Sequence, residues 1–479
     1  MPNKGLASSK PWMLALAALL LLVGAGGLLW ACAPSPEVAV EVATRTPKPS
    51  FTPTVAAQAP TATLPLPTAT IVRAAEQATN TIVIANTATS TATALPPTDT
   101  AVPPTVTNTP VPPTSTPVPA TDTPAPTATP SPPPAKSLRM NSPEYGMQAF
   151  LWWRPEVASR DMGAIHDAGF TWIKQDFAWR EIEGTGKGQF DWSRTDWIVS
   201  EANKLGIDLM VRVDRQPYWA RASEAENGPP DKYQDLADFC FALASRYQGR
   251  IRAYEIWNEP NLAREWGGQP PDPGAYVKLL KTAYAAIKRA DPNAMVISAG
   301  LTPTGTWSNE AMPDDVYLDN MYQAMGGNSN GYFDVLGAHG AGYKAPPEMS
   351  PDEVASNPAY GGHRIFCFRR VEDLRNIMVK YGDGNKQVAL LEFGWTSDPI
   401  HEAYAWHRVS EEEKADYLVR AYKWAKENWS PWIGLMNLIF FANPDWTEQN
   451  EEYWWAVTEP GYPELKPRPA YNALKAMPK

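Results

Sequence analysis

Eight short apolar runs, each followed by an amphipathic stretch, constrain the fold of this chain more than any other feature. The runs are rich in β-branched and aromatic residues and end near Gly, Pro or polar residues, the pattern of strands in βα units. The expected strands are residues 145–151, 170–176, 207–213, 252–257, 294–299, 333–338, 387–392 and 432–440. Eight such units in about 340 residues fit a (β/α)₈ barrel. The sequence therefore predicts an α/β fold with a barrel over residues 137–479.

The segments between these runs carry helix start and stop signals. In residues 231–249, Asp231 is the expected N-cap and Gly249 the expected stop, and residues 271–292 form a second clear helix. A doubly wound open sheet also alternates strands and helices. It is disfavoured because no Gly-rich phosphate-binding turn follows the first expected strand.

The N-terminal residues 1–36 have the pattern of an export signal. Two lysines precede an apolar stretch over residues 12–31, and small residues and prolines follow it. The stretch is close to the length of a membrane span, so a cleaved signal peptide and an uncleaved anchor both stay open. The segment "LLWAC" resembles a bacterial lipobox, in which Cys32 would be lipidated. Each alternative places the remaining chain outside the cytoplasm, either anchored to the cell surface or secreted.

Residues 37–136 are built mainly from Thr, Pro, Ala, Val and Ser, with Phe51 as their only aromatic residue. Such a segment cannot bury enough apolar surface to offset the entropy of ordering. We therefore expect a disordered, polyproline-II-leaning linker between the N-terminal segment and the barrel. O-glycosylation of the linker is compatible with this role and stays open.

Composition excludes several classes of function. The net charge of −10 provides no basic patch for nucleic acid. Cys240 and Cys367 stand among apolar neighbours without CxxC spacing, and the five histidines form no HExxH pattern, so we expect free buried thiols, no metal and no cofactor. We expect the barrel domain to be monomeric and to meet a membrane only through the N-terminal anchor.

Two glutamates lie where a barrel carries its functional groups, at the carboxyl ends of strands. Glu259 follows the fourth expected strand in "AYEIWNEPNLAREW", and Glu392 ends the seventh in "VALLEFGWTSD". About three βα units separate them, so their side chains can face one cavity. Paired carboxylates of this kind suggest glycoside chemistry, in which one stays protonated for the leaving oxygen and the other is ionised to attack the anomeric carbon.

The motifs "IWNEPN" and "LLEFGW" give the domain a resemblance to the retaining glycoside hydrolases of the TIM-barrel clan A, most like family 39 and neighbouring cellulase-like families. The resemblance spans essentially all of residues 140–479. It implies that Glu259 is the general acid/base, Glu392 the nucleophile and Asn258 a partner of the sugar 2-hydroxyl. In that clan a His or Tyr near strand six helps to orient the nucleophile, and "GAHGAGY" offers His339 and Tyr343.

Departures from the clan pattern affect sugar positioning. The clan often has Arg on strand two, where "WIKQDFAW" places Lys174. It often has Trp at the end of strand eight, where "LIFFANPDW" offers Phe440, Phe441 or Trp446 for stacking. Further aromatic candidates follow the expected strands and could stack on sugar rings: Trp152, Trp153, Trp179, Trp219, Trp266 and Trp395.

The predicted activity is cleavage of O-glycosidic bonds in a poly- or oligosaccharide by double displacement. A catalytically silent glycan-binding surface protein is the alternative from another class, and its expected mark, the loss of either carboxylate, is absent. A transglycosylase would use the same covalent intermediate, and the sequence leaves that alternative open.

Overall fold

The structure is a computed structural model, and it describes residues 137–479 except 224 and 226. The signal or anchor expected over residues 1–36, the lipidation site at Cys32 and the linker expected over residues 37–136 lie outside the described residues. Within the described part, no helix is long and apolar enough to cross a membrane.

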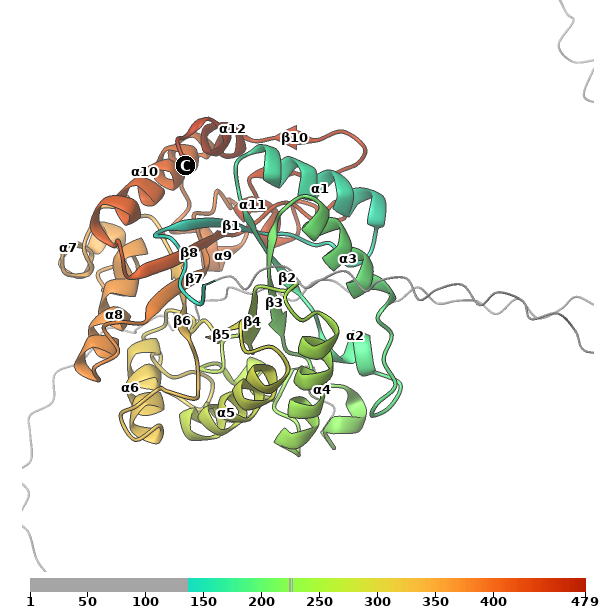
Figure 1. Ribbon diagram of the computed structural model, residues 1–479. Helices are drawn as coiled ribbons and strands as arrows, with labels where there is room; N and C mark the ends of the chain where they lie inside the picture. Colours follow the sequence, from blue (N-terminus) through green and yellow to red (C-terminus); the bar gives the residue numbers. More distant parts are fainter. Residues whose placement is uncertain (1–136, 224, 226) are drawn as a thin grey trace, which may run out of the picture. The chain divides into compact units, whose positions relative to one another are not determined.

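The described chain folds as a closed barrel of eight parallel strands in sequence order, with helices around it (Figure 1). The ring closes where β1 pairs with β8, with Glu144 opposite Leu435. The strands are β1 Glu144–Gln148, β2 Trp172–Asp176, β3 Asp208–Val213, β4 Ala253–Ile256, β5 Met295–Ser298, β6 Val335–Ala341, β7 Gln387–Gly394 and β8 Ile433–Leu438. All eight expected strands are confirmed, and closure of the sheet excludes the doubly wound alternative.

Helices follow every strand, and shorter elements decorate the loops. The main helices are α1 Pro155–Asp167, α3 Ser193–Lys204, α4 Tyr233–Arg246, α5 Pro273–Ala290, α6 Asp314–Ala324, α8 Val371–Lys380, α10 Glu411–Asn428 and α12 Pro469–Ala476. The short helices are α2 Trp179–Glu183, α7 Pro351–Ala355, α9 Glu402–Ala405 and α11 Glu451–Trp455. The 3₁₀ turns are η1 Tyr218–Ala220, η2 Ala263–Glu265, η3 Pro358–Tyr360 and η4 Phe368–Arg370, and β9 Thr458–Glu459 pairs with β10 Lys466–Pro467.

The expected start of the helix after β3 is wrong by one position. The N-cap of α4 is Lys232, which makes no side-chain cap, and the carboxylate of Asp231 accepts instead from the backbone N–H of Ala222. A contact with the preceding loop therefore replaces the local cap. Beyond the other end of the helix, Gly249 adopts a left-handed φ of 70° that suits glycine.

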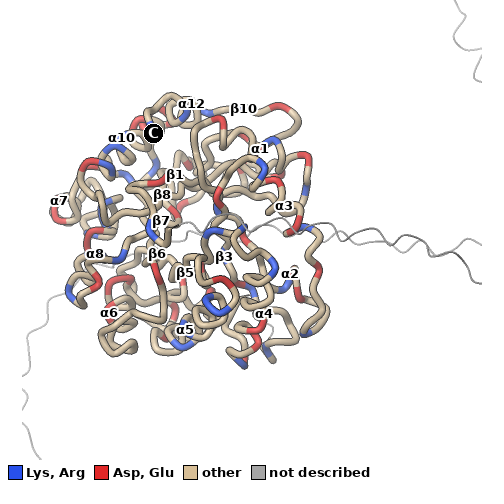
Figure 2. The backbone as a smooth tube through the Cα atoms, in the orientation of Figure 1, with Lys and Arg blue, Asp and Glu red and all other residues tan. Residues whose placement is uncertain are grey.

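The barrel interior changes from apolar to charged along the strands. Residues two apart on a strand share one face, so the change can be followed by comparing positions two apart. A lower apolar layer includes Trp172, Met210 and Ala253. Two positions further toward the carboxyl ends of the same strands lie Lys174, Arg212 and Glu255. On the outside of the molecule, acidic and basic residues are interspersed around the helical ring (Figure 2). Lys174, Arg212 and Glu255 thus form a charged interior layer toward the carboxyl ends of the strands, at the barrel mouth.

The two described cysteines are free and buried, as expected. Cys240 lies on α4, and Cys367 directly precedes η4. Burial raises the pKa of both thiols, that of Cys367 to about 12.

Candidate active site

Glu259 stands on a turn that the backbone holds in an unusual conformation. Strand β4 ends at Ile256, after which Trp257 and Glu259 both have positive φ angles, 77° and 39°. Non-glycine residues in this region cost about 1–3 kcal/mol each and persist only where the surroundings impose them. Here the indole of Trp257 donates to the carbonyl of Glu265, and the N–H of Glu259 donates to the carbonyl of Gly300. The turn thereby fixes where the Glu259 carboxyl group points.

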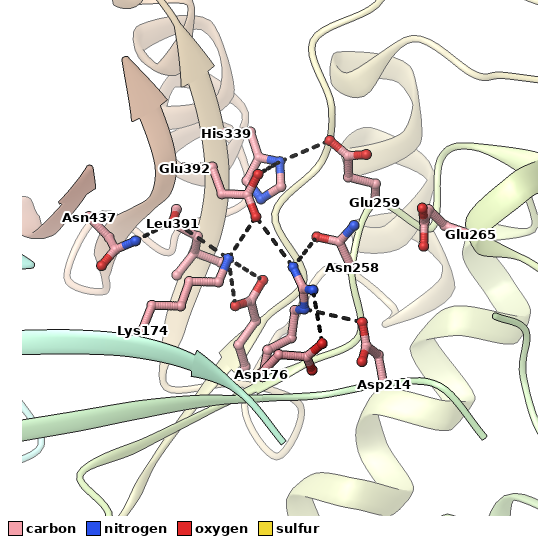
Figure 3. Close-up of polar contacts among 12 residues, drawn as sticks. Lys174, Asp176, Asp214, Asn258, Glu259, Glu265, His339, Leu391, Glu392 and Asn437 are labelled. Atoms are coloured by element: carbon pink, nitrogen blue, oxygen red, sulfur yellow. Dashed lines mark hydrogen bonds and ion pairs between the residues drawn. The ribbon is translucent and has the colours of Figure 1, made fainter. Parts of the chain in front are cut away.

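Glu392 lies within β7 and is held by two cations, one from β2 and one from β3 (Figure 3). Its Oε1 accepts from Nζ of Lys174 on β2 at 3.0 Å and from Arg212 on β3 at 3.3 Å. Its Oε2 is buried and has no hydrogen-bond partner within the described part of the chain. One oxygen therefore anchors the side chain while the other keeps its lone pairs.

The protonation state of Glu392 follows from these neighbours. Burial alone raises the pKa of a carboxyl group. For Glu392 the positive charges of Lys174, His339 and Arg212 outweigh burial and lower the pKa to about 2, from an ordinary 4.5. Glu392 is therefore ionised at neutral pH.

His339 on β6 lies between the two glutamates (Figure 3). Its Nδ1 is 3.1 Å from Oε1 of Glu259 and 3.9 Å from Oε2 of Glu392. The two oxygens can be no farther apart than the sum of these distances, roughly 7 Å. This limit is compatible with the separation of about 5–5.5 Å between the carboxyl groups of retaining enzymes. The shorter contact joins His339 to Glu259, whereas the sequence pointed to the nucleophile.

Both oxygens of Glu259 are engaged in this structure. Oε1 contacts His339, and Oε2 accepts from the guanidinium of Arg264 on η2 at 3.2 Å. The side chains of Glu259 and His339 are both fully buried. A substrate oxygen therefore reaches the carboxyl group of Glu259 only after one of the side chains that cover it moves.

Lys174 and Asn258 also converge on this centre. Lys174 bridges Glu392 and Glu255, each at 3.0 Å, so it lies beside the predicted nucleophile, and its role in sugar binding stays a prediction. The Oδ1 of Asn258 accepts from Arg212 at 3.2 Å. Because its oxygen is occupied, the amide of Asn258 has its N–H group to offer to a sugar hydroxyl.

Sequence reasoning missed a charged group beside the glutamates. It consists of Arg212, Asp176 and Asp214. Arg212 reaches Asp214 at 3.1 Å and Asp176 at 3.5 Å, and Arg215 reaches Asp176 at 3.2 Å. Burial and the nearby charge of Asp176 raise the pKa of Asp214 to about 7. Burial acts the same way on Asp176, but Arg215 and Arg212 prevail and lower its pKa. The available signal was the alternation in "MVRVDR", which places Arg212 on the inner face of β3.

Four predicted binding residues lie in packed surroundings. The ring of Trp179 is fully buried between Trp219 and Phe239, and that of Trp395 is fully buried with its indole N–H on the carbonyl of Ala345. Tyr343 and Trp446 belong to a second apolar cluster, in which Tyr343 packs on Phe366 and Trp446 on Phe150. Phe440 and Phe441 are buried too. As placed, none of these rings presents an open face, so their stacking roles stay predictions.

Other aromatic rings on the strand-to-helix loops are exposed. Trp153 between β1 and α1, Tyr218 in η1 after β3 and Trp307 between β5 and α6 are 52%, 57% and 68% exposed. Tyr218 and Trp307 were not singled out from the sequence, because exposure of a loop aromatic has no local sequence signal. Exposed rings at a barrel mouth suit the C–H faces of a ligand.

The arrangement supports acid–base chemistry at a polarised bond. It combines an ionised carboxylate with a free oxygen, a second carboxyl group beside it and an imidazole between them. Among residues 137–479 apart from 224 and 226, no three His, Cys, Asp or Glu side chains are grouped so that they could hold a metal ion. The contacts around His339 make the two glutamates the candidate groups for reaction.

Residues 135–330 match the family model described as Cellulase (glycosyl hydrolase family 5). Among curated proteins, the chain is 26% identical over 134 residues to a β-xylosidase of Geobacillus stearothermophilus. That match covers 24% of this chain and a quarter (25%) of the length of the β-xylosidase.

The fold is also similar to solved glycoside hydrolase structures. One is a family 39 glycoside hydrolase from Bacteroides cellulosilyticus, with a TM-score of 0.49, 21% identity and coverage of 70% of this chain and 63% of that chain. Another is xylanase 10B from Thermotoga maritima, with a TM-score of 0.47, 15% identity and coverage of 71% and 95%. The family that matches by sequence is thus cellulase-like, and the finer likeness to family 39 stays a prediction.

Proposed function

We propose, from the membership of this domain in the TIM-barrel glycoside hydrolases of clan A, that it cleaves O-glycosidic bonds of a poly- or oligosaccharide with retention of anomeric configuration. The single observation that carries the assignment of Glu392 as the nucleophile is the setting of its carboxylate. That carboxylate is ionised, anchored through Oε1 and free at Oε2, within 3.9 Å of the imidazole that Glu259 contacts.

In the first displacement, Oε2 of Glu392 attacks the anomeric carbon and forms a glycosyl ester. The bond from that carbon to the glycosidic oxygen breaks at the same time. Glu259 supplies a proton to the leaving oxygen, so the departing sugar leaves as a neutral alcohol.

In the second displacement, the now ionised Glu259 takes a proton from water. The water oxygen attacks the anomeric carbon, and the ester bond to Glu392 breaks. Lys174 and Arg212 stabilise the returning carboxylate, because they already contact its Oε1 in the free enzyme. Each step inverts the anomeric carbon, so the product retains the configuration of the substrate.

Substrate binding is proposed to use Asn258 and the exposed loop aromatics. Asn258 would donate its amide N–H to the sugar 2-hydroxyl, since Arg212 occupies its oxygen. Trp153, Tyr218 and Trp307 would stack on sugar rings around the mouth. The sugar and the linkage are left to experiment.

The N-terminal pattern supports a proposed location outside the cytoplasm. A signal or anchor over residues 1–36, with Cys32 as a lipidation candidate, would tether the barrel through the Thr/Pro-rich linker. Metabolic labelling with a radiolabelled fatty acid would test this, with the label expected in the full chain and lost in Cys32→Ser.

Product analysis tests the proposed function. The full chain is incubated with a panel of polysaccharides and aryl glycosides, and the products are identified by mass spectrometry and by NMR of the anomeric proton. Release of new reducing ends or free sugar is expected, and it should disappear in Glu392→Gln. Larger glycans built from the donor would favour the transglycosylase. Binding to glycans without any bond cleavage would favour the silent glycan-binding protein.

A further inference from the structure

Arg264 contacts the oxygen of Glu259 that His339 does not contact. A general acid must come within about 2.6–3.2 Å of the oxygen that it protonates. In this structure Oε2 of Glu259 is 3.2 Å from Arg264, and the Glu259 side chain is fully buried. His339 holds the other oxygen from within a strand and is itself fully buried. Arg264 is 29% exposed on a three-residue turn, so it is the partner that can move.

The charge of Arg264 also favours the carboxylate form of Glu259, whereas the first displacement needs the carboxylic acid. A cation at this distance stabilises the carboxylate over the carboxylic acid. Glu259 must be the acid in the first displacement and the carboxylate in the second. Contact with Arg264 therefore opposes the first displacement and supports the second.

A second acidic residue, Glu265, lies beside Arg264. The Nε of Arg264 lies 3.7 Å from Oε1 of Glu265, and Glu265 is fixed by the amide of Asn227 at 2.7 Å. Arg264 can therefore keep an ionic partner when it leaves Glu259. Arg264 thus lies within reach of two acids, Glu259 after β4 and Glu265 on η2.

We propose that Arg264 is a positioning residue that covers Glu259 in the free enzyme, leaves it when the sugar enters, and returns to it for the second displacement. This inference rests on the proposed function, since it assigns Glu259 the acid/base role. On departure of Arg264, Glu259 takes a proton from solvent, and it passes that proton to the leaving oxygen. On return, Arg264 stabilises the ionised Glu259 that accepts a proton from water.

Other groups also face this carboxyl group and bear on its titration. His339 contacts it from β6, Glu392 on β7 lies behind that imidazole, and Tyr343 after β6 lies close enough to sense its charge. Tyr404 on α9 and Glu451 on α11 act on Arg264 from the other side. Replacing Arg264 also removes its charge from Glu265 and Glu451, so the comparison with Arg264→Lys, which keeps that charge, is needed to interpret a shift.

The test is a pair of pH profiles for Arg264→Met in the full chain. On a substrate with a poor leaving group, the basic limb of kcat/KM should move up by about one pH unit, because Glu259 keeps its proton to higher pH. On a dinitrophenyl glycoside, for which the second displacement limits kcat, the acidic limb of kcat should move up by a similar amount. Arg264→Lys keeps the charge and should restore both limbs.

Controls separate this inference from the proposed function. Arg246→Met removes another arginine–carboxylate pair, with Asp196 on the outer helices, and should leave both profiles unchanged. If Arg264→Met does not fold, Arg264→Gln carries the same test. Loss of turnover in Glu259→Gln together with profiles of Arg264→Met that superimpose on wild type would overturn the inference alone. A shift in Arg264→Lys as large as that in Arg264→Met would overturn it too.

A direct titration tests the inference without turnover. In protein labelled with ¹³C at the glutamate carboxyl groups, the resonance missing from Glu259→Gln identifies Glu259. Its midpoint should rise in Arg264→Met by about one pH unit and stay near wild type in Arg264→Lys. An unchanged midpoint in Arg264→Met would contradict the inference even if no glycoside were cleaved.

Discussion

Lys174 Nζ lies 3.0 Å from Oε1 of Glu392, and both side chains are enclosed in the barrel. The same nitrogen lies 3.0 Å from Glu255, so one lysine bridges two buried carboxylates on different strands. A buried charge that loses its partner is costly, because the interior cannot solvate it. The charge that prepares Glu392 for reaction is therefore also a charge on which the fold depends.

Replacement of Lys174 by Met should cost about 3–5 kcal/mol of unfolding free energy at pH 7, because it removes a buried cation that contacts both Glu255 and Glu392. Chemical denaturation followed by circular dichroism measures this loss. Adding Glu255→Gln should recover part of it, because one of the two buried carboxylates that lost the lysine is then uncharged. A Lys174→Met protein as stable as wild type would show that the pair does not support the fold.

The same ion pair predicts an acid dependence. The pKa of Glu392 is lowered from 4.5 to about 2, so its contribution to stability is present above about pH 4.5 and is lost as the pH falls toward 2. Wild-type stability should decline in that window, and the part due to Glu392 should be missing in Glu392→Gln. Parallel curves of unfolding free energy against pH for the two proteins would contradict this.

Asp214 should act in the opposite direction. Its pKa is raised from 3.8 to about 7, so the folded protein binds the extra proton and this contribution is lost as the pH rises from about 4 to 7. Asp214→Asn mimics the protonated form and should remove that part of the decline. Denaturant titrations between pH 4 and 8 check the difference, and a decline that persists unchanged in Asp214→Asn would contradict the assignment.

Gly300 gives His339 its space. A Cβ atom at Gly300 would lie 2.1 Å from Cδ2 of the imidazole, so Gly300→Ala must displace the ring. We expect a loss of roughly 10–100-fold in kcat/KM, since small displacements of catalytic groups carry penalties of that size. Gly163→Ala on α1, where nothing lies within 4 Å of the new atom, is the matched control and should leave kcat/KM unchanged. Equal activity in the two variants would show that the position of His339 does not matter.

The two buried thiols should stay free. Cys240 lies on α4 and Cys367 directly before η4, and both are buried, with raised pKa values. Thiol reagents should therefore modify them only after unfolding. Peptide mapping of the non-reduced protein checks this, and a peptide that links Cys240 to Cys367 would contradict the strand order.

The strands and the two glutamates could be predicted because their signals are local. Apolar β-branched runs mark each strand, and Asn258 and Glu259 stand together in one motif. The partners of the glutamates could not be predicted in the same way. Arg212 touches Glu392 only because β3 and β7 face each other across a closed barrel, a relation that depends on the register of the strands.

Other features depend on packing that local sequence does not encode. Trp179 and Tyr218 both follow strands, yet the first is fully buried and the second exposed. Asp231 has the residue type of an N-cap, but a contact with the loop at Ala222 takes its carboxylate. In each case the competing partner is set by the tertiary structure.

The central claim is the division of duties between Glu259 and Glu392, and azide rescue tests it most directly. Glu259→Ala should still form the intermediate from an aryl glycoside with a good leaving group, because that step needs little protonation. Added azide should then restore turnover, and NMR of the glycosyl azide should show the anomeric configuration of the substrate, while Glu392→Ala stays inactive without azide. An inverted glycosyl azide from Glu259→Ala, or rescue confined to Glu392→Ala, would contradict the account.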